Sequence, residues 1–298
     1  MSRGEPSLTG LPASLRATVQ DRLGSPIRDA HPVSGGCIHD ARLLELEGGS
    51  RAFLKWGARQ DPEIFVAEAE GLDALRVAGA PRLPQVLGVS AAGEGPGWLL
   101  LEYIAPGRPG PAFHDQLAVG LASIHRAGTG PAGWHRQGWI GPLDQDNRRS
   151  PDWPAFWRDR RLLPQLERAH REGLLDRLRS PWPELLDRVE VLLAHRSGAA
   201  RLHGDLWSGN VFADGAGEPV LIDPAVYHGD ALVDLAMAYL FGGFAPRFFR
   251  AYYEAAELDE ESERERALYQ LYPLLVHVNL FGGSYVRAAL RSASLVLS

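Results

Sequence analysis

Lysine is almost absent from this chain. Of its 298 residues 31 are Lys or Arg, and because Lys55 is the only lysine, the other 30 are arginine. The ammonium of lysine is a compact point charge on a flexible stem, whereas the guanidinium of arginine is a planar fork. A lysine kept at one position of an arginine-rich chain is therefore the first candidate for a role that arginine cannot fill.

Cysteine and long apolar runs are also scarce. The single cysteine, Cys37, cannot form an internal disulfide or a Cys-based zinc site, so we expect a reducing compartment and a cytoplasmic location. In its glycine-rich segment Cys37 is either a small apolar filler or a redox switch that acts through an intermolecular disulfide. No apolar run approaches the roughly 18 residues of a membrane span, and the first nine residues contain no secretory signal. We expect no membrane contact.

The chain has no excess of positive charge. Its formal net charge is -6 and no basic stripe is visible, which argues against a nucleic-acid partner. Hydrophobic residues at 45% and charged residues at 23% are ordinary for a soluble enzyme. No Gly-Lys-Ser/Thr sequence occurs, which argues against a P-loop kinase. Small-molecule chemistry is favoured, and we expect a monomer or weak dimer.

Apolar spacing predicts an α+β, bilobed architecture. We expect a small antiparallel sheet with one main helix in residues 1–104, and a larger, mainly helical lobe in residues 105–298 after the turn-rich segment 105–111. The expected strands are 41–46, 51–56, 86–89 and 98–103; the expected helices are 11–23, 62–77, 158–176, 184–196, 231–240, 246–256 and a helical pattern across 263–296.

Residues 131–157 have no clear periodicity and are expected to be loop-like. They contain four of the eight tryptophans: Trp134, Trp139, Trp153 and Trp157. Aromatic rings stack on the apolar faces of sugars and also fill protein cores. The sequence leaves both interpretations open.

Three polar residues in the second half have the order that phosphoryl transfer requires. Asp205 follows His203 and Gly204, Asn210 lies five residues later, and Asp223 ends a strand-like apolar run. In kinases one Asp receives the proton of the acceptor hydroxyl, while an Asn and a second Asp hold magnesium through hard oxygen atoms. Taken separately, these fragments are more typical of turns and strand-end caps.

The first half supplies the rest of that set. Gly35 and Gly36 form a glycine turn about twenty residues before Lys55, where they could cover the phosphates of ATP. Glu68, on the helix after the lysine strand, is the expected partner of Lys55. The combined pattern predicts Asp205 as the base and Asn210 and Asp223 as magnesium ligands.

The segment Leu202-His203-Gly204-Asp205-Leu206-Trp207-Ser208-Gly209-Asn210 resembles the catalytic loop of the fructosamine kinase (ketosamine-3-kinase) family, which is related to aminoglycoside and choline kinases. Trp207 is the distinguishing residue. Further matching stretches are Gly35-Gly36-Cys37-Ile38, Phe53-Leu54-Lys55, Phe65 to Leu72, Gly133-Trp134-His135 and Asp234 to Phe244. The resemblance covers nearly the whole chain.

This resemblance implies a protein-kinase-like fold and phosphorylation, by ATP and Mg²⁺, of a sugar hydroxyl on ketoamines, a deglycation step. The substrate would be a small sugar amine or a glycated protein, and the backbone of Glu102, Tyr103 and Ile104 would meet adenine. The chain departs from the family pattern at Gln137-Gly138-Trp139 and at Asp230-Ala231-Leu232. An aminoglycoside- or choline-type kinase and an inactive binding module are the alternatives.

Overall fold

The computed structural model describes residues 10–33, 40–57, 62–91, 96–175 and 181–298. The predictions for Gly35, Gly36 and Cys37 therefore concern residues outside these ranges.

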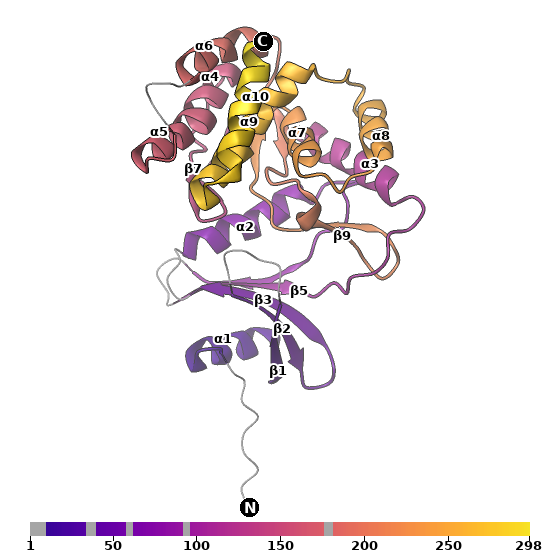
Figure 1. The fold of residues 1–298 in the computed structure, drawn as a ribbon. Coiled ribbons are helices and arrows are strands. Elements are labelled where there is room, and N and C mark those ends of the chain that lie inside the picture. The colour runs from indigo at the N-terminus through magenta and orange to yellow at the C-terminus, as the bar shows by residue number, and fades with distance from the viewer. Residues whose placement is uncertain (1–9, 34–39, 58–61, 92–95, 176–180) are drawn as a thin grey trace, which may run out of the picture.

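A five-stranded antiparallel sheet dominates the first hundred residues (Figure 1). Its strand order is β1-β2-β3-β5-β4. The bounds are β1 Ile27–Pro32, β2 Asp40–Leu46, β3 Arg51–Gly57, β4 Val86–Val89 and β5 Gly97–Glu102. Four strands match the expected ones to within about a residue. The sequence analysis missed β1, a polar edge strand that ends in proline and buries only Ile27 and Ala30.

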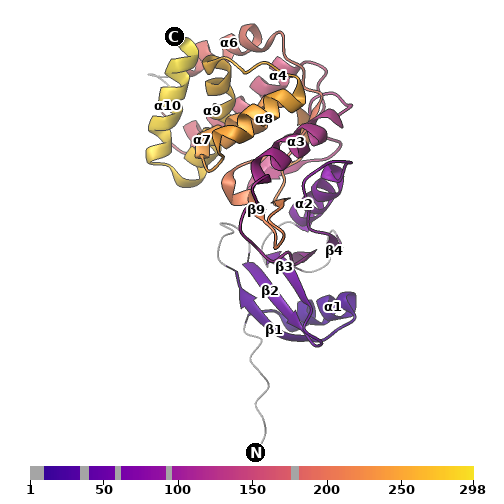
Figure 2. The same ribbon diagram turned by 90° about the vertical axis from the view of Figure 1, so that its right-hand side faces the viewer.

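The two faces of the sheet carry different helices (Figure 2). Helix α1 (Ala13–Leu23) packs Leu15 and Val19 on the face that contains Leu54 and Leu100. Helix α2 (Pro62–Leu75) packs on the opposite face, which Leu99 and Leu101 share. Because side chains alternate between the faces of a strand, Lys55 points toward α2.

The second half is a helical lobe with short two-stranded sheets (Figures 1 and 2). Its helices are α3 Phe113–Arg126, α4 Trp153–Trp157, α5 Leu163–Arg171, α6 Trp182–Leu193, α7 Leu232–Phe241, α8 Pro246–Ala256, α9 Glu263–Phe281 and α10 Ser284–Leu297. Its strands are β6 Gly138–Ile140, β7 Leu143–Gln145, β8 Ala200–Leu202, β9 Val211–Ala213, β10 Pro219–Leu221 and β11 Tyr227–Gly229.

Two expectations for this half need correction. The helical pattern across 263–296 forms two helices, because Gly282 and Gly283 take positive φ values of 60° and 53° that end α9. The segment expected to be a loop contains the β6–β7 hairpin and helix α4. None of the helices in the ranges described is both long and apolar enough to cross a membrane.

The chain crosses between the two halves through residues 103–112. Pro106 pairs with Asp214, and Gly107 donates its N–H to Ala213 O at 2.7 Å. A Cβ on Gly107 would lie 2.1 Å from Asp214 O, so only glycine permits this approach. We propose a lobe boundary between residues 104 and 105. The hydrophobic core continues across it from α2 into the helical lobe.

Candidate active site

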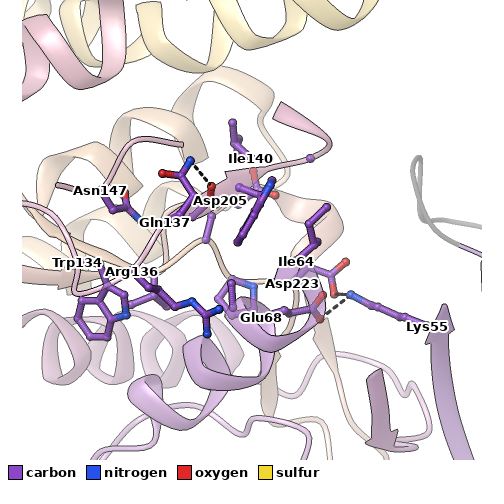
Figure 3. A pocket seen from close by; sticks show the side chains of 17 residues that line it. Lys55, Ile64, Glu68, Trp134, Arg136, Gln137, Ile140, Asn147, Asp205 and Asp223 are labelled. Carbon is purple, nitrogen blue, oxygen red and sulfur yellow. Dashed lines mark hydrogen bonds and ion pairs between the residues drawn. The ribbon is translucent and has the colours of Figure 1, made fainter. Parts of the chain in front are cut away.

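Lys55 forms two short ion pairs, which join β3 to α2 and to the segment after β10 (Figure 3). Its Nζ lies 2.7 Å from Glu68 Oε1 on α2 and 2.7 Å from Asp223 Oδ1 after β10. The side chain is 8% exposed. Burial alone would lower the pKa of the ammonium, but the charges of Asp223 and Glu68 outweigh it and raise that pKa above its ordinary value. Lys55 is therefore a fixed cation.

The loop after β8 is held by a buried carboxylate. Asp234, at the start of α7, accepts hydrogen bonds from the backbone N–H groups of His203 at 2.7 Å and Gly204 at 2.9 Å. His203 Nε2 lies 3.0 Å from Ile222 O. His203 therefore braces the loop, and Asp234 anchors its amides.

Gly204 holds this loop in a conformation that requires glycine. Its φ is +81°, a region that glycine tolerates, and a Cβ there would lie 2.1 Å from Ala225 O. The absence of a side chain lets the loop before Asp205 approach the segment after Asp223. These two acids come together through this contact.

Asp205 and Asn210 are joined directly. Asn210 Nδ2 donates to Asp205 Oδ2 and to Asp205 O, each at 2.9 Å. Burial raises the pKa of Asp205 to about 7; Asn210 opposes this shift, and the neighbouring Asp223 and Asp234 add to it. A carboxyl group poised near neutral pH suits proton transfer.

Asp223 has an unusual backbone. Its φ is +56°, which is rare for a residue other than glycine and concentrates at functional sites. Its Oδ1 contacts Lys55, while its side chain is 37% exposed. The carboxylate therefore reaches open space on the side away from the lysine.

Two cavities meet at Lys55 and Asp223. The first lies against strands β2, β3 and β5 of the sheet and includes Glu102, Tyr103, Ile104 and Asn210 among its lining residues. Glu102 donates its backbone N–H to Gln85 O at 2.8 Å, and its carboxylate pairs with Arg82 at 2.6 Å. These two groups of Glu102 are therefore engaged, and the next residues in the cavity wall are Tyr103 and Ile104.

The second cavity lies between α2 and the β6–β7 hairpin and is drawn in Figure 3. Asp205 is in its wall, together with Trp134 and Trp139. By contrast, Trp153 and Trp157 are buried in the core, 3% and 0% exposed. Two tryptophans of this segment therefore pack in the core and two line a cavity, and sugar stacking by the latter two stays a prediction.

The sequence analysis missed two polar residues of the second cavity, Arg136 and Asn147. Arg136 forms ion pairs with Glu63 and, at 2.8 Å, with Glu70, both on α2. Asn147 follows β7 and is 1% exposed. Neither lies within one of the motifs quoted above, and the partners of Arg136 are distant in the sequence.

The geometry defines a phosphotransferase of the protein-kinase-like type, with a buried Lys-Glu pair in a sheet lobe facing an Asp-Asn-Asp set in a helical lobe. The sequence model described as fructosamine kinase matches residues 13–298. The chain belongs to this family and is an ATP-dependent kinase.

Individual relatives agree with this assignment. A protein of Synechocystis assigned as a ketoamine kinase is 35% identical over 91% of this chain and 92% of its own length. The chloroplastic protein-ribulosamine 3-kinase of Oryza sativa subsp. indica is 33% identical over 87% of this chain and 75% of its own.

Solved structures show the same fold. A Thermobifida fusca structure assigned as a fructosamine-3-kinase has a TM-score of 0.85 and 34% identity, covering 95% of this chain and 98% of that one. An aminoglycoside phosphotransferase solved with ADP and hygromycin B has a TM-score of 0.62 at 17% identity, covering 96% and 98%. That second likeness extends to the fold alone.

Proposed function

We propose that this kinase transfers the γ-phosphoryl group of ATP to a sugar hydroxyl of a ketoamine, on a small sugar amine or a glycated protein, in the cytoplasm. The observation that carries the proposal is the pair of cavities that share Lys55 and Asp223. ATP occupies the cavity beside Tyr103 and Ile104, and the acceptor occupies the cavity whose wall includes Asp205. The names of the relatives supply the ketoamine class.

Each polar residue has a proposed role. Lys55, oriented by Glu68, neutralises phosphate oxygens, and Gly35 and Gly36 cover the phosphates. Asp205 takes the proton of the acceptor hydroxyl, and the hydrogen bond from Asn210 Nδ2 holds its carboxylate in place.

The donor set at the junction of the cavities fits magnesium. Asn210 makes its hydrogen bonds to Asp205 through Nδ2, and Asp223 uses Oδ1 on Lys55, so Asn210 Oδ1 and Asp223 Oδ2 are the hard oxygen atoms for a cation. Among the residues that the structure describes, no three His, Cys, Asp or Glu side chains form a metal site. Mg²⁺ would therefore be held jointly by these two residues and the phosphates, where it neutralises their charge.

The charges of the acceptor cavity favour a polyol over a polycation. Glu68, Asp205 and Asp223 lie in its wall with the cations Lys55 and Arg136, and Lys55 already pairs with two of the acids. An aminoglycoside would need a clear excess of unpaired acid. This balance supports the ketoamine over the aminoglycoside alternative.

A phosphoryl-transfer screen tests the proposal. Purified protein with ATP and Mg²⁺ is offered free fructosamines, ribulosamines, glycated peptides, choline and aminoglycosides, and ADP release is measured. We expect release with the ketoamines and a phosphorylated sugar by mass spectrometry. Turnover confined to choline or aminoglycosides would contradict the proposed substrate class, and no turnover with any acceptor would support a binding module instead.

A further inference from the structure

Arg161 is a buried cation beside the acceptor cavity. It lies in the π-helical turn Arg158–Leu162 and is 0% exposed. Its guanidinium carbon lies 4.0 Å from the centre of the Tyr227 ring and 4.6 Å from that of Phe156. Within the described ranges no carboxylate forms an ion pair with it. The positive charge is stabilised by aromatic faces and by neutral oxygen atoms.

Two of those oxygen atoms belong to the segment after β7. Arg161 Nη1 donates to Asp146 O at 2.7 Å, and Arg161 Nη2 donates to Asn147 Oδ1 at 2.7 Å. A guanidinium has only donors, so the atom of the Asn147 amide that faces it must be the oxygen. Arg161 therefore fixes the amide orientation of Asn147 and turns its Nδ2 away.

The rest of Asn147 is held equally firmly. Its backbone carbonyl accepts a hydrogen bond at 2.8 Å from the N–H of Trp134, another wall residue. Gly138 lies against the amide, and a Cβ at this position would be 2.4 Å from Asn147 Nδ2. Asn147 is thus positioned on several sides in the wall of the cavity.

Asn147 Nδ2 nevertheless has no hydrogen-bond partner among the described residues. Buried donors are rarely left unpaired, because losing their water is unfavourable unless an acceptor replaces it. Here the unpaired donor belongs to a residue that lines the cavity with Asp205 (Figure 3). A ligand oxygen in that cavity would supply the missing acceptor.

We propose that Asn147 Nδ2 donates a hydrogen bond to an oxygen of the acceptor sugar, and that Arg161 is the positioning residue that sets this donor. The inference rests on the proposed function only in placing a hydroxylated acceptor in this cavity. A site built to bond an oxygen discriminates strongly against an analogue that lacks it, since the buried donor is then left unpaired. Asn147 therefore determines specificity.

The first test is Asn147→Asp. The carboxylate keeps an acceptor for Arg161 and gains a charge-assisted bond, so the variant should fold, but it has no N–H group. Asn279→Asp is the matched control, because the Asn279 amide is bonded to Gln165 outside both cavities. Calorimetry with a non-hydrolysable ATP analogue and a free fructosamine should show roughly tenfold weaker fructosamine binding for Asn147→Asp only, with nucleotide affinity unchanged.

Monodeoxy fructosamines then identify the bonded oxygen. One analogue should bind wild type about as weakly as the parent sugar binds Asn147→Asp, and its affinity should not change on substitution. In Arg161→Gln the affinity for the parent sugar should fall toward that for the deoxy analogue, while the affinity for the nucleotide stays unchanged. A merely structural role would lower the affinities for the sugar and for the nucleotide together. Wild-type affinity of Asn147→Asp for the parent sugar, or an equal loss with every analogue, overturns the proposal.

The outcome is separable from that of the proposed function. If wild type binds an aminoglycoside or an amino alcohol and no ketoamine, the ketoamine assignment fails. The same comparison with hydroxyl-lacking analogues of that acceptor then decides the role of Asn147. Failure to bind any hydroxylated acceptor overturns both.

Discussion

The ammonium of Lys55 and the carboxylate of Asp223 lie 2.7 Å apart although 168 positions separate them in the chain. This contact joins strand β3 of the sheet lobe to the segment after β10 in the helical lobe. Glu68 holds the same ammonium from α2. The lysine is therefore the point at which the two cavities and both halves of the chain meet.

Replacing this lysine by arginine should abolish most activity. In Lys55→Arg the planar fork cannot occupy the buried space between two carboxylates with the geometry of an ammonium. We expect kcat/KM for ATP to fall by about 10² to 10³, the scale for losing one preorganised charge. Arg28→Lys, at an exposed ion pair on β1, is the control and should be neutral. Wild-type kinetics in Lys55→Arg would show that arginine can replace Lys55 and that this lysine has no special role.

Asp205→Ala should separate chemistry from nucleotide binding. Loss of the proton acceptor should lower kcat by about 10² to 10⁴ and leave the Kd for ATP nearly unchanged. Steady-state kinetics and nucleotide titration measure the two quantities. Asp144→Ala, an exposed acid on β7, is the comparison and should retain activity. A rate equal to wild type in Asp205→Ala would remove Asp205 from the mechanism.

Asp205 should also make the protein less stable as pH rises. The pKa of its carboxyl is about 7 in the folded chain against 3.8 ordinarily, so the folded state binds the proton more tightly and loses stability between these values. Asp205→Asn carries no charge and should escape this loss. Without nucleotide and with EDTA, the Tm of the variant should exceed that of wild type by a margin that is near zero below pH 4 and largest above pH 7. A margin independent of pH would contradict the shift.

The sequence was sufficient for the parts of the site that lie in local patterns. Alternation of apolar residues predicted the strand of Lys55 and the helix of Glu68, and their ion pair has the expected partner. The roles proposed for Asp205, Asn210 and Asp223 still await experiment, although the structure brings these residues together.

What the sequence could not supply depends on contacts between distant segments. Asn147 lies in the stretch without clear periodicity and Arg161 in the predicted helix 158–176. Neither pattern indicates the hydrogen bonds from Arg161 to Asp146 O and Asn147 Oδ1, or its contacts with the rings of Phe156, Tyr227 and Tyr272. Strand β1 was missed for a similar reason, since an edge strand buries little and leaves no clear alternation. Burial of polar partners is a property of the folded chain.

Arg136 should couple the acceptor cavity to the ion pair between Lys55 and Glu68. It ties the β6 side of the cavity to Glu70, two residues beyond Glu68 on α2. Arg136→Gln should loosen α2 and reduce transition-state stabilisation by about 0.5–2 kcal/mol, the range for mutations that act through a network of contacts. A double-mutant cycle with Glu70→Gln, followed by kcat/KM for ATP, measures this. Additive losses in the cycle would show that the ion pair carries no coupling.

Gly204→Ala should destabilise the protein more than the same change at another left-handed glycine. Gly173 also has a positive φ of +71°, but a Cβ there meets nothing within 4 Å, so Gly173→Ala should cost only the backbone penalty of about 1–2 kcal/mol. At Gly204 the new methyl would meet Ala225 O at 2.1 Å, which adds about 1–3 kcal/mol of overpacking. Urea unfolding of both variants measures the difference. Equal midpoints would mean that the loop before Asp205 can move away from the segment after Asp223, and the close approach would then not be what holds the two acids together.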